Sequence, residues 1–154
     1  MLKNYKLIIV SILLILIMFS LVGCGDKTAI SSETFKSKMQ DKEYYIYNAT
    51  SQFGDDVEEV YYAILSDKYR IQFYKFSDIE HTENAFSKSK SDFEVVGENS
   101  KPTTNTSASN TQKYILDNNG QYMVLSRIDN TLIQIIASSE YKSEIDKILK
   151  ELGY

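Results

Sequence analysis

The chain has 154 residues, which is enough for one domain once a targeting segment is set aside. It carries 21 acidic and 17 basic residues, and this net charge of −4 argues against nucleic acid as a partner. With one cysteine and one histidine, it can form no intramolecular disulfide and offers few ligands for zinc.

The first residues have the form of an export signal. Lys3 and Lys6 make a cationic start, and residues 7–22 are apolar apart from two serines. As a helix this run would be about 24 Å long, which is shorter than the roughly 30 Å hydrocarbon core of a bilayer. We therefore predict a signal segment over residues 1–23 that is removed after export.

The four residues Leu21-Val22-Gly23-Cys24 resemble the lipobox of bacterial lipoproteins. In that family the cysteine sulfur receives a diacylglyceryl group and the signal is cut just before the cysteine. The resemblance implies that Cys24 is lipidated and holds the protein on the extracytoplasmic face of the cell membrane, since two acyl chains bind a bilayer durably. The alternative is an uncleaved anchor helix with a free thiol at Cys24. Cleavage would leave 15 basic residues against 21 acidic ones, a net charge of −6.

Residues 24–30 form a short polar tether in this interpretation. A helix is expected to begin near Ser31, which can cap it, and to end near Asp41. Ile30 and Phe35 have the spacing of a hydrophobic staple around that cap.

Three segments with strand-like alternation follow at residues 44–49, 57–65 and 69–74. Ser66-Asp67 between the second and third fits a tight turn, which predicts hairpin-connected strands. A second helix is predicted behind Ser77, because Ser77 and Glu80 have the form of a capping box.

Residues 97–113 contain one hydrophobic residue, Ala108, and most of the others are Ser, Thr and Asn. Such a stretch buries too little apolar surface to order itself, so we predict a mobile loop of about this length within the domain.

Three more strands are predicted at residues 114–116, 122–128 and 132–137, separated by turn sequences rich in Asp, Asn and Gly. A last helix is expected after Ser139, which can cap it, and Gly153 ends it. Its apolar residues fall on one stripe at helical spacing: Tyr141, Ile145, Ile148, Leu149 and Leu152.

The predicted order is therefore α-βββ-α-βββ-α over a single domain, residues 31–154. Strands joined by tight turns pair antiparallel, so we expect an α+β fold with a sheet of about six strands and helices packed on it.

Several of the strands are apolar on both faces. In the second strand, one face carries Tyr61, Ala63 and Leu65, and the other carries Val60, Tyr62 and Ile64. Either helices cover both faces of the sheet, or part of one face is a recognition surface.

The residues that could take part in catalysis or metal binding are each explained by a structural role. His81 lacks partner ligands and is expected at the surface. The acidic cluster lacks the loop spacing of a calcium site and is interpreted as a solvated turn; its members are Asp55, Asp56, Glu58 and Glu59. Arg127 is expected to brace its hairpin by pairing with Asp129 or with an acid of a neighbouring strand. We predict no catalytic, metal-binding or cofactor-binding residue, and no cofactor.

The chain as a whole resembles small lipoproteins of clostridia and related low-GC Gram-positive bacteria. The lipobox and three further segments carry the resemblance, at residues 35–39, 127–131 and 148–154. The resemblance implies no activity.

The sequence thus predicts a membrane-anchored, non-catalytic binding module at the cell envelope, with a protein or cell-wall partner. A small envelope hydrolase is the first alternative, and it predicts a concave pocket with two convergent acids of perturbed pKa. A small-ligand carrier is the second, and it predicts an enclosed apolar cavity.

Overall fold

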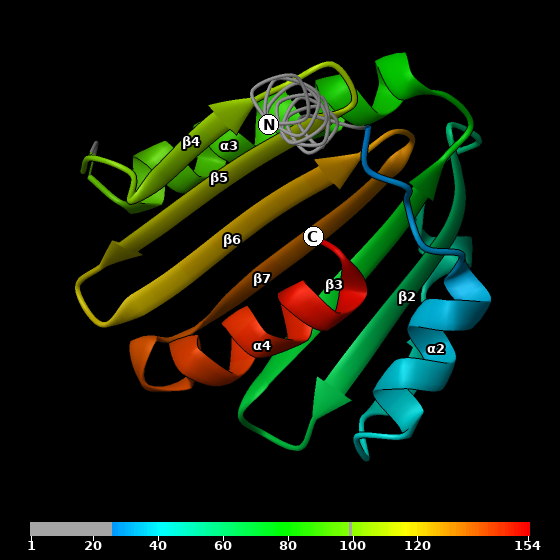
Figure 1. The fold of residues 1–154 in the computed structure, drawn as a ribbon, viewed down its shortest axis with the longest axis horizontal. Helices are drawn as coiled ribbons and strands as arrows, with labels where there is room; N and C mark the ends of the chain where they lie inside the picture. Colours follow the sequence, from blue (N-terminus) through cyan, green and yellow to red (C-terminus); the bar gives the residue numbers. More distant parts are fainter. Residues whose placement is uncertain (1–25, 99) are drawn as a thin grey trace, which may run out of the picture.

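A computed structural model describes residues 26–98 and 100–154 of the chain (Figure 1). The predicted signal over residues 1–23 and the predicted lipidation site, Cys24, lie outside the described residues. No helix within the described ranges is long and apolar enough to cross a membrane.

The described residues form three α-helices, two short 3-10 turns and seven strands. The helices are α2 (Ser32–Gln40), α3 (Ile79–Val96) and α4 (Lys142–Leu152), and the 3-10 turns are η1 (Thr50–Gln52) and η2 (Ser139–Tyr141). The strands are β1 (Tyr45–Asn48), β2 (Val57–Leu65), β3 (Tyr69–Phe76), β4 (Thr104–Ser107), β5 (Thr111–Asn118), β6 (Gln121–Ile128) and β7 (Thr131–Ser138).

All seven strands form one antiparallel sheet in the order β1-β2-β3-β7-β6-β5-β4. The two halves of the chain join where β3 pairs with β7, with Phe73 opposite Ile133. The predicted α+β class with an antiparallel sheet is therefore confirmed. The second half of the chain contributes four strands rather than the three predicted.

The additional strand, β4, lies inside the segment predicted to be a mobile loop. Thr104 pairs with Ile115 and Ser107 pairs with Gln112, so β4 forms one edge of the sheet. The apolar pattern gave no sign of it because the exposed side chains of an edge strand can be polar on both faces while its backbone still bonds to its neighbour. β5 is also longer than predicted, because its polar residues Thr111, Gln112 and Lys113 pair with β6 and continue the strand beyond the apolar segment.

The helix starts only partly follow the predictions. The Ser31 hydroxyl accepts a hydrogen bond from the Thr34 N–H at 3.2 Å, which confirms the first cap. Asp78, not Ser77, caps α3 and accepts from the His81 N–H at 2.9 Å. Ser139 begins the turn η2 rather than a helix, and α4 starts three residues later. The expected end at Gly153 is confirmed, since its φ of +87° suits glycine.

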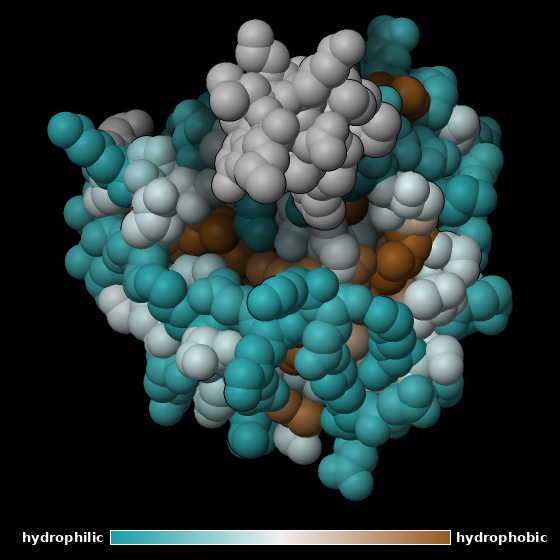
Figure 2. Space-filling view, in the orientation of Figure 1, coloured by the Kyte–Doolittle hydropathy of each residue, from teal (hydrophilic) through white to brown (hydrophobic). Residues whose placement is uncertain are grey.

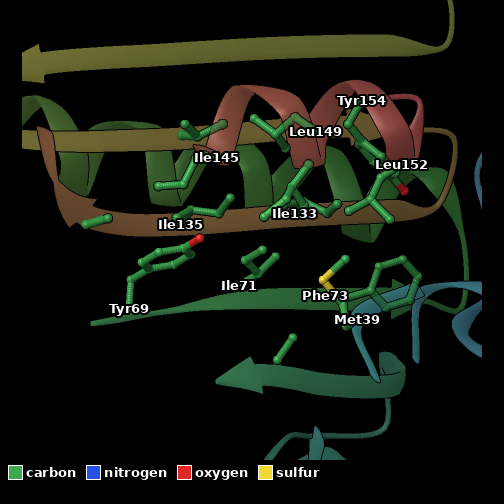
Figure 3. Close-up of a cluster of buried hydrophobic side chains, with 14 of the residues drawn as sticks. Met39, Tyr69, Ile71, Phe73, Ile133, Ile135, Ile145, Leu149, Leu152 and Tyr154 are labelled. Carbon is green, nitrogen blue, oxygen red and sulfur yellow. The ribbon is translucent and has the colours of Figure 1, made fainter. Parts of the chain in front are cut away.

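Helices lie on both sides of the sheet (Figure 1). We name the side that carries α2 and α4 the α4 face, and the side that carries α3 the α3 face. The larger core fills the α4 face, where the stripe of α4 meets apolar residues of β3 and β7 (Figure 3). Phe35 of α2 stacks on Phe73 of β3 with ring centroids 4.8 Å apart. The outward side of α4 is hydrophilic (Figure 2).

Tyrosine hydroxyls fasten α4 to the sheet at the rim of this core. Three pairs link the two layers: Tyr69 with Glu144, Tyr122 with Asp146, and Tyr154 with Thr131. The hydroxyl of Tyr44 joins the first pair by bonding to that of Tyr69. Burial raises the pKa of Tyr44 to about 12, so the phenols stay neutral and act as uncharged hydrogen-bonding groups at physiological pH.

A smaller core on the α3 face contains Arg127, whose side chain is only 1% exposed. Its Nη2 lies 3.1 Å from the carboxylate of Glu83 on α3. Its Nε donates to Oε1 of Gln112, and its Nη1 donates to the main-chain oxygen of Asp129. Arg127 thus braces the β6–β7 hairpin as predicted. The acid that pairs with it comes from a helix, and not from Asp129 or a neighbouring strand.

The pairing of Arg127 with Glu83 can be tested by a double-mutant cycle. We expect Glu83→Ala to lower the free energy of unfolding by about 1–2 kcal/mol, because a buried guanidinium loses its counter-ion while water moderates the loss at the half-exposed carboxylate. In an Arg127→Met background the same change should have little further effect. Urea denaturation measures both, with Asp92→Ala as an exposed control on α3. An equal loss in both backgrounds would contradict the coupling.

Candidate functional site

The α3 face is wider than the helix that covers it. Seven strands about 4.8 Å apart span about 29 Å, whereas one helix is about 10 Å wide. α3 packs against β6, β7 and β3, in the middle of the strand order. Within residues 26–98 and 100–154, no α-helix therefore covers β1 or the part of β2 beyond Val57 on this face.

Exposed side chains on this face form a contiguous surface over β1, β2 and the adjoining ends of β3 and β7, which we call the aromatic patch. It consists of Tyr45, Tyr47, Tyr62, Ile64, Arg70 and Ile136. The strand register makes them neighbours: Tyr45 is opposite Ile64, Tyr47 opposite Tyr62, Ile64 opposite Arg70, and Arg70 opposite Ile136. Tyr45 is 67% exposed, Ile136 44% and Tyr47 40%. An apolar surface of this kind on a sheet is a candidate interaction site.

The rings of Tyr47 and Tyr62 in the patch are held in place by their neighbours. The ring of Tyr47 lies 6.2 Å from that of Tyr62, and the Tyr47 hydroxyl accepts a hydrogen bond of 2.9 Å from Gln52. The guanidinium of Arg70 lies 4.9 Å from the centre of the Tyr62 ring, within cation–π distance. A partner would therefore meet rings that have already lost part of their freedom, which lowers the entropy cost of binding.

A groove of about 250 Å³ opens beside the patch, between α3 and the sheet. Gln134 belongs to its wall and lies two residues before Ile136 on the same face of β7. Phe53 reaches over from the loop after η1 and meets Tyr74 edge-on, with centroids 5.6 Å apart. The groove and the patch thus form one adjoining surface on the α3 face.

His81 lies at the surface, as predicted, between two aspartates. Its Nδ1 is 2.9 Å from the Asp78 carboxylate and its Nε2 is 3.3 Å from that of Asp56. The hydrogen bond to Asp78, aided by the charge of Asp56, raises the pKa of His81 above its usual value. These contacts join the start of α3 to the turn before β2. They stabilise the fold locally. Asp78 also borders an open hollow beside Asp129, which His81 does not line.

The remaining members of the acidic cluster do not converge on a site. Glu58 and Glu59 both pair with Lys75 of β3, at 2.7 and 3.7 Å. No group of three potential metal ligands gathers anywhere in residues 26–98 and 100–154.

Neither alternative function finds its expected feature in the described part of the chain. The carboxyl groups with shifted pKa values are Asp78, Asp117 and Glu151, and hydrogen-bond donors lower the pKa of each. A hydrolase acid needs the opposite shift. The hollows beside α4 and between α3 and the sheet are open to solvent and do not form the enclosed apolar cavity that a carrier predicts.

Comparisons of this chain with protein-family models, with curated proteins and with solved structures find no match. The resemblance to clostridial lipoproteins therefore stays a prediction from the residues quoted above.

The sequence pointed to the site only in part. The apolar second face of β2, with Tyr62 and Ile64, was visible as an alternation pattern. The exposure of Tyr45, Tyr47 and Ile136 was not, because it depends on where α3 crosses the sheet.

The paired aspartates make His81 a test of the local geometry. We expect its pKa, measured by NMR titration of the single histidine, to lie above the ordinary 6.5, and Asp78→Asn to lower it while keeping the helix cap. A raised pKa means that the pair stabilises the fold below pH 6.5 and that this stabilisation fades as pH rises through the folded-state pKa. Asp67→Asn, in a distant hairpin, should change nothing. A pKa at or below 6.5 would contradict the contacts.

Proposed function

We propose that this protein is a lipid-anchored, non-catalytic binding module on the outer face of a bacterial cell membrane, and that the aromatic patch is its recognition surface for a protein partner. The lipobox supports the anchor, since Cys24 follows a cationic start and a short apolar run. The uncovered half of the α3 face is the observation that carries the binding role.

The composition of the patch favours a protein partner. Tyrosine and arginine are enriched among the residues that contribute most at protein interfaces. The tyrosine ring is rigid and buries much surface, and the arginine guanidinium is planar and offers five hydrogen-bond donors. Ile64 and Ile136 between the rings gain most from an apolar counterpart that excludes water. A sugar would stack on a ring but would leave the isoleucine side chains wet.

An anchor suits such a module. Attachment through Cys24 would confine the domain to a thin layer above the bilayer and so raise its effective concentration toward other membrane-bound proteins. A modest intrinsic affinity of the patch would then be sufficient for stable association.

The anchor predicts a modification at one atom. When cells that make the full chain are grown with labelled palmitate, we expect the label in the wild-type protein and not in Cys24→Ala, which should also leave the membrane fraction. Thr28→Ala, four residues on and exposed, is the matched control and should keep the label. An unlabelled wild-type protein would refute the anchor.

The patch predicts a defined loss of binding. A photo-crosslinking residue at position 45 should capture a discrete membrane or envelope protein, and the same residue at position 95, on the equally exposed Val95, should not. With that partner purified, Tyr47→Ser and Ile136→Ser should each weaken affinity at least about tenfold, or about 1.4 kcal/mol, and Val95→Ser should not. Unchanged thermal unfolding shows that the variants fold. Capture that does not differ between positions 45 and 95 would remove the patch as the binding surface.

A further inference from the structure

The residues just after Cys24 are bound to the domain. Asn110, in the β4–β5 hairpin, holds Lys27 by two hydrogen bonds: its side-chain Nδ2 donates to the Lys27 main-chain oxygen at 2.6 Å, and its Oδ1 accepts from the Lys27 N–H at 3.3 Å. The neighbouring Ser109 hydroxyl donates to the Asp26 carboxylate at 2.6 Å. The side-chain amide of Asn110 thus bonds to both the N–H and the C=O of Lys27, as the main chain of a neighbouring β-strand would.

Two further contacts extend this attachment. Nζ of Lys27 donates to the main-chain oxygen of Gly153 at the end of α4, at 3.1 Å. Ala29 and Ile30 then pack against the larger core before Ser31 opens α2. We call these contacts of residues 26–30 the tether clasp. Figure 1 shows the chain that enters α2 running along one end of the sheet.

We infer that the tether clasp sets the orientation of the domain on the membrane, with the β4–β5 hairpin toward the bilayer and the aromatic patch turned away from it, toward a protein partner outside. This inference rests on the anchor proposed above. A short polar linker without such contacts would let the domain rotate freely about its anchor, and the tether clasp removes that freedom.

The short covalent distance between Cys24 and Asp26 supports the first part of the inference, that the β4–β5 hairpin lies toward the bilayer. Cys24 precedes Asp26 by two residues, so their Cα atoms are at most about 7 Å apart whatever the conformation. A lipid on Cys24 therefore brings the bilayer surface close to Ser109 and Asn110. The β6–β7 turn lies at the same end of the sheet, because the N–H of Asp129 bonds to the Asn110 main-chain oxygen.

The register of the sheet supports the second part, that the aromatic patch is turned away from the bilayer. β5 and β7 have eight residues each, so the two ends of the sheet are about 26 Å apart. The β2–β3 turn at residues 66–68 lies at the far end, and Ile64, Arg70 and Tyr45 adjoin it. The patch thus occupies the membrane-distal half of the α3 face.

Electrostatics favours this arrangement over a domain lying flat. With a net charge of −6 after removal of residues 1–23, the body of the protein is repelled by an anionic leaflet. The patch contains one charged residue, Arg70, and a single cation attracts anionic headgroups by only about 1 kcal/mol, which does not offset the repulsion of the acidic body. The upright orientation therefore depends on the clasp, and the exposed patch is left for a protein.

The test places a single fluorophore at either end of the sheet in the full-length, lipidated protein. Ala108→Cys labels the near hairpin and Asp67→Cys labels the far one; both residues are exposed, and the thiol of Cys24 is blocked by lipid. Energy transfer to an acceptor headgroup is read in vesicles of equal parts phosphatidylglycerol and phosphatidylcholine. We expect strong transfer from position 108 and little from position 67.

Two variants separate the clasp from other causes. Asn110→Ala removes the bonds to Lys27 and should make transfer from positions 108 and 67 nearly alike. Asn118→Ala removes a comparable amide, bonded to Gly97 at the other end of β5, and should preserve the difference. Thermal unfolding confirms that both variants fold.

The outcomes are distinguishable. Intact mass of the same preparation shows whether the diacylglyceryl group is present, and its absence overturns the anchor together with the orientation. Lipidated wild-type protein with equal transfer from both positions overturns the orientation alone. A difference that survives Asn110→Ala overturns the two hydrogen bonds between Asn110 and Lys27 as its cause.

Discussion

The strands in the middle of this sheet are apolar on both faces, so the fold depends on keeping water from both at once. Among the described residues, two α-helices shield the α4 face and one, α3, shields the other. One helix is much narrower than seven strands, and the part left open falls on β1 and β2, farthest from the line where α3 crosses. The side chains exposed there are mostly tyrosines, whose rings tolerate water better than aliphatic groups do because each carries a hydroxyl. The candidate recognition surface is thus a direct consequence of unequal helix cover.

The sheet also has two unlike ends. The hairpin that contains Asn110, the end of α4 at Gly153 and the tether meet at one end, whereas the patch adjoins the other. Antiparallel pairing produces this separation, since each strand of eight residues carries the chain the full length of the sheet before it returns. A lipid attached near one end and a binding surface near the other would give the domain a polarity suited to presenting the patch outward.

The charged groups that first suggested chemistry serve the architecture instead. Asp78 caps α3 and holds His81, and Arg127 joins β5, the β6–β7 turn and α3 through its three nitrogens. A carboxylate surrounded by donors has a lowered pKa and stays ionised at neutral pH, which suits a structural ion and makes a poor general acid. The same donors that stabilise the fold therefore remove these groups from the set of plausible proton donors.

The sequence by itself determined the features that depend on neighbouring residues: the cap at Ser31, the apolar stripe of α4 and its end at Gly153, the tight turns, and the antiparallel α+β class. It also showed that β2 is apolar on both sides. It did not reveal β4, because a polar edge strand is defined by its bonds to β5 and carries no periodicity of its own. Only the tertiary structure decided which part of the α3 face stays open and that Lys27 binds Asn110, 83 residues further along the chain. Both follow from where distant segments come to lie, and local patterns of hydrophobicity hold no information about that.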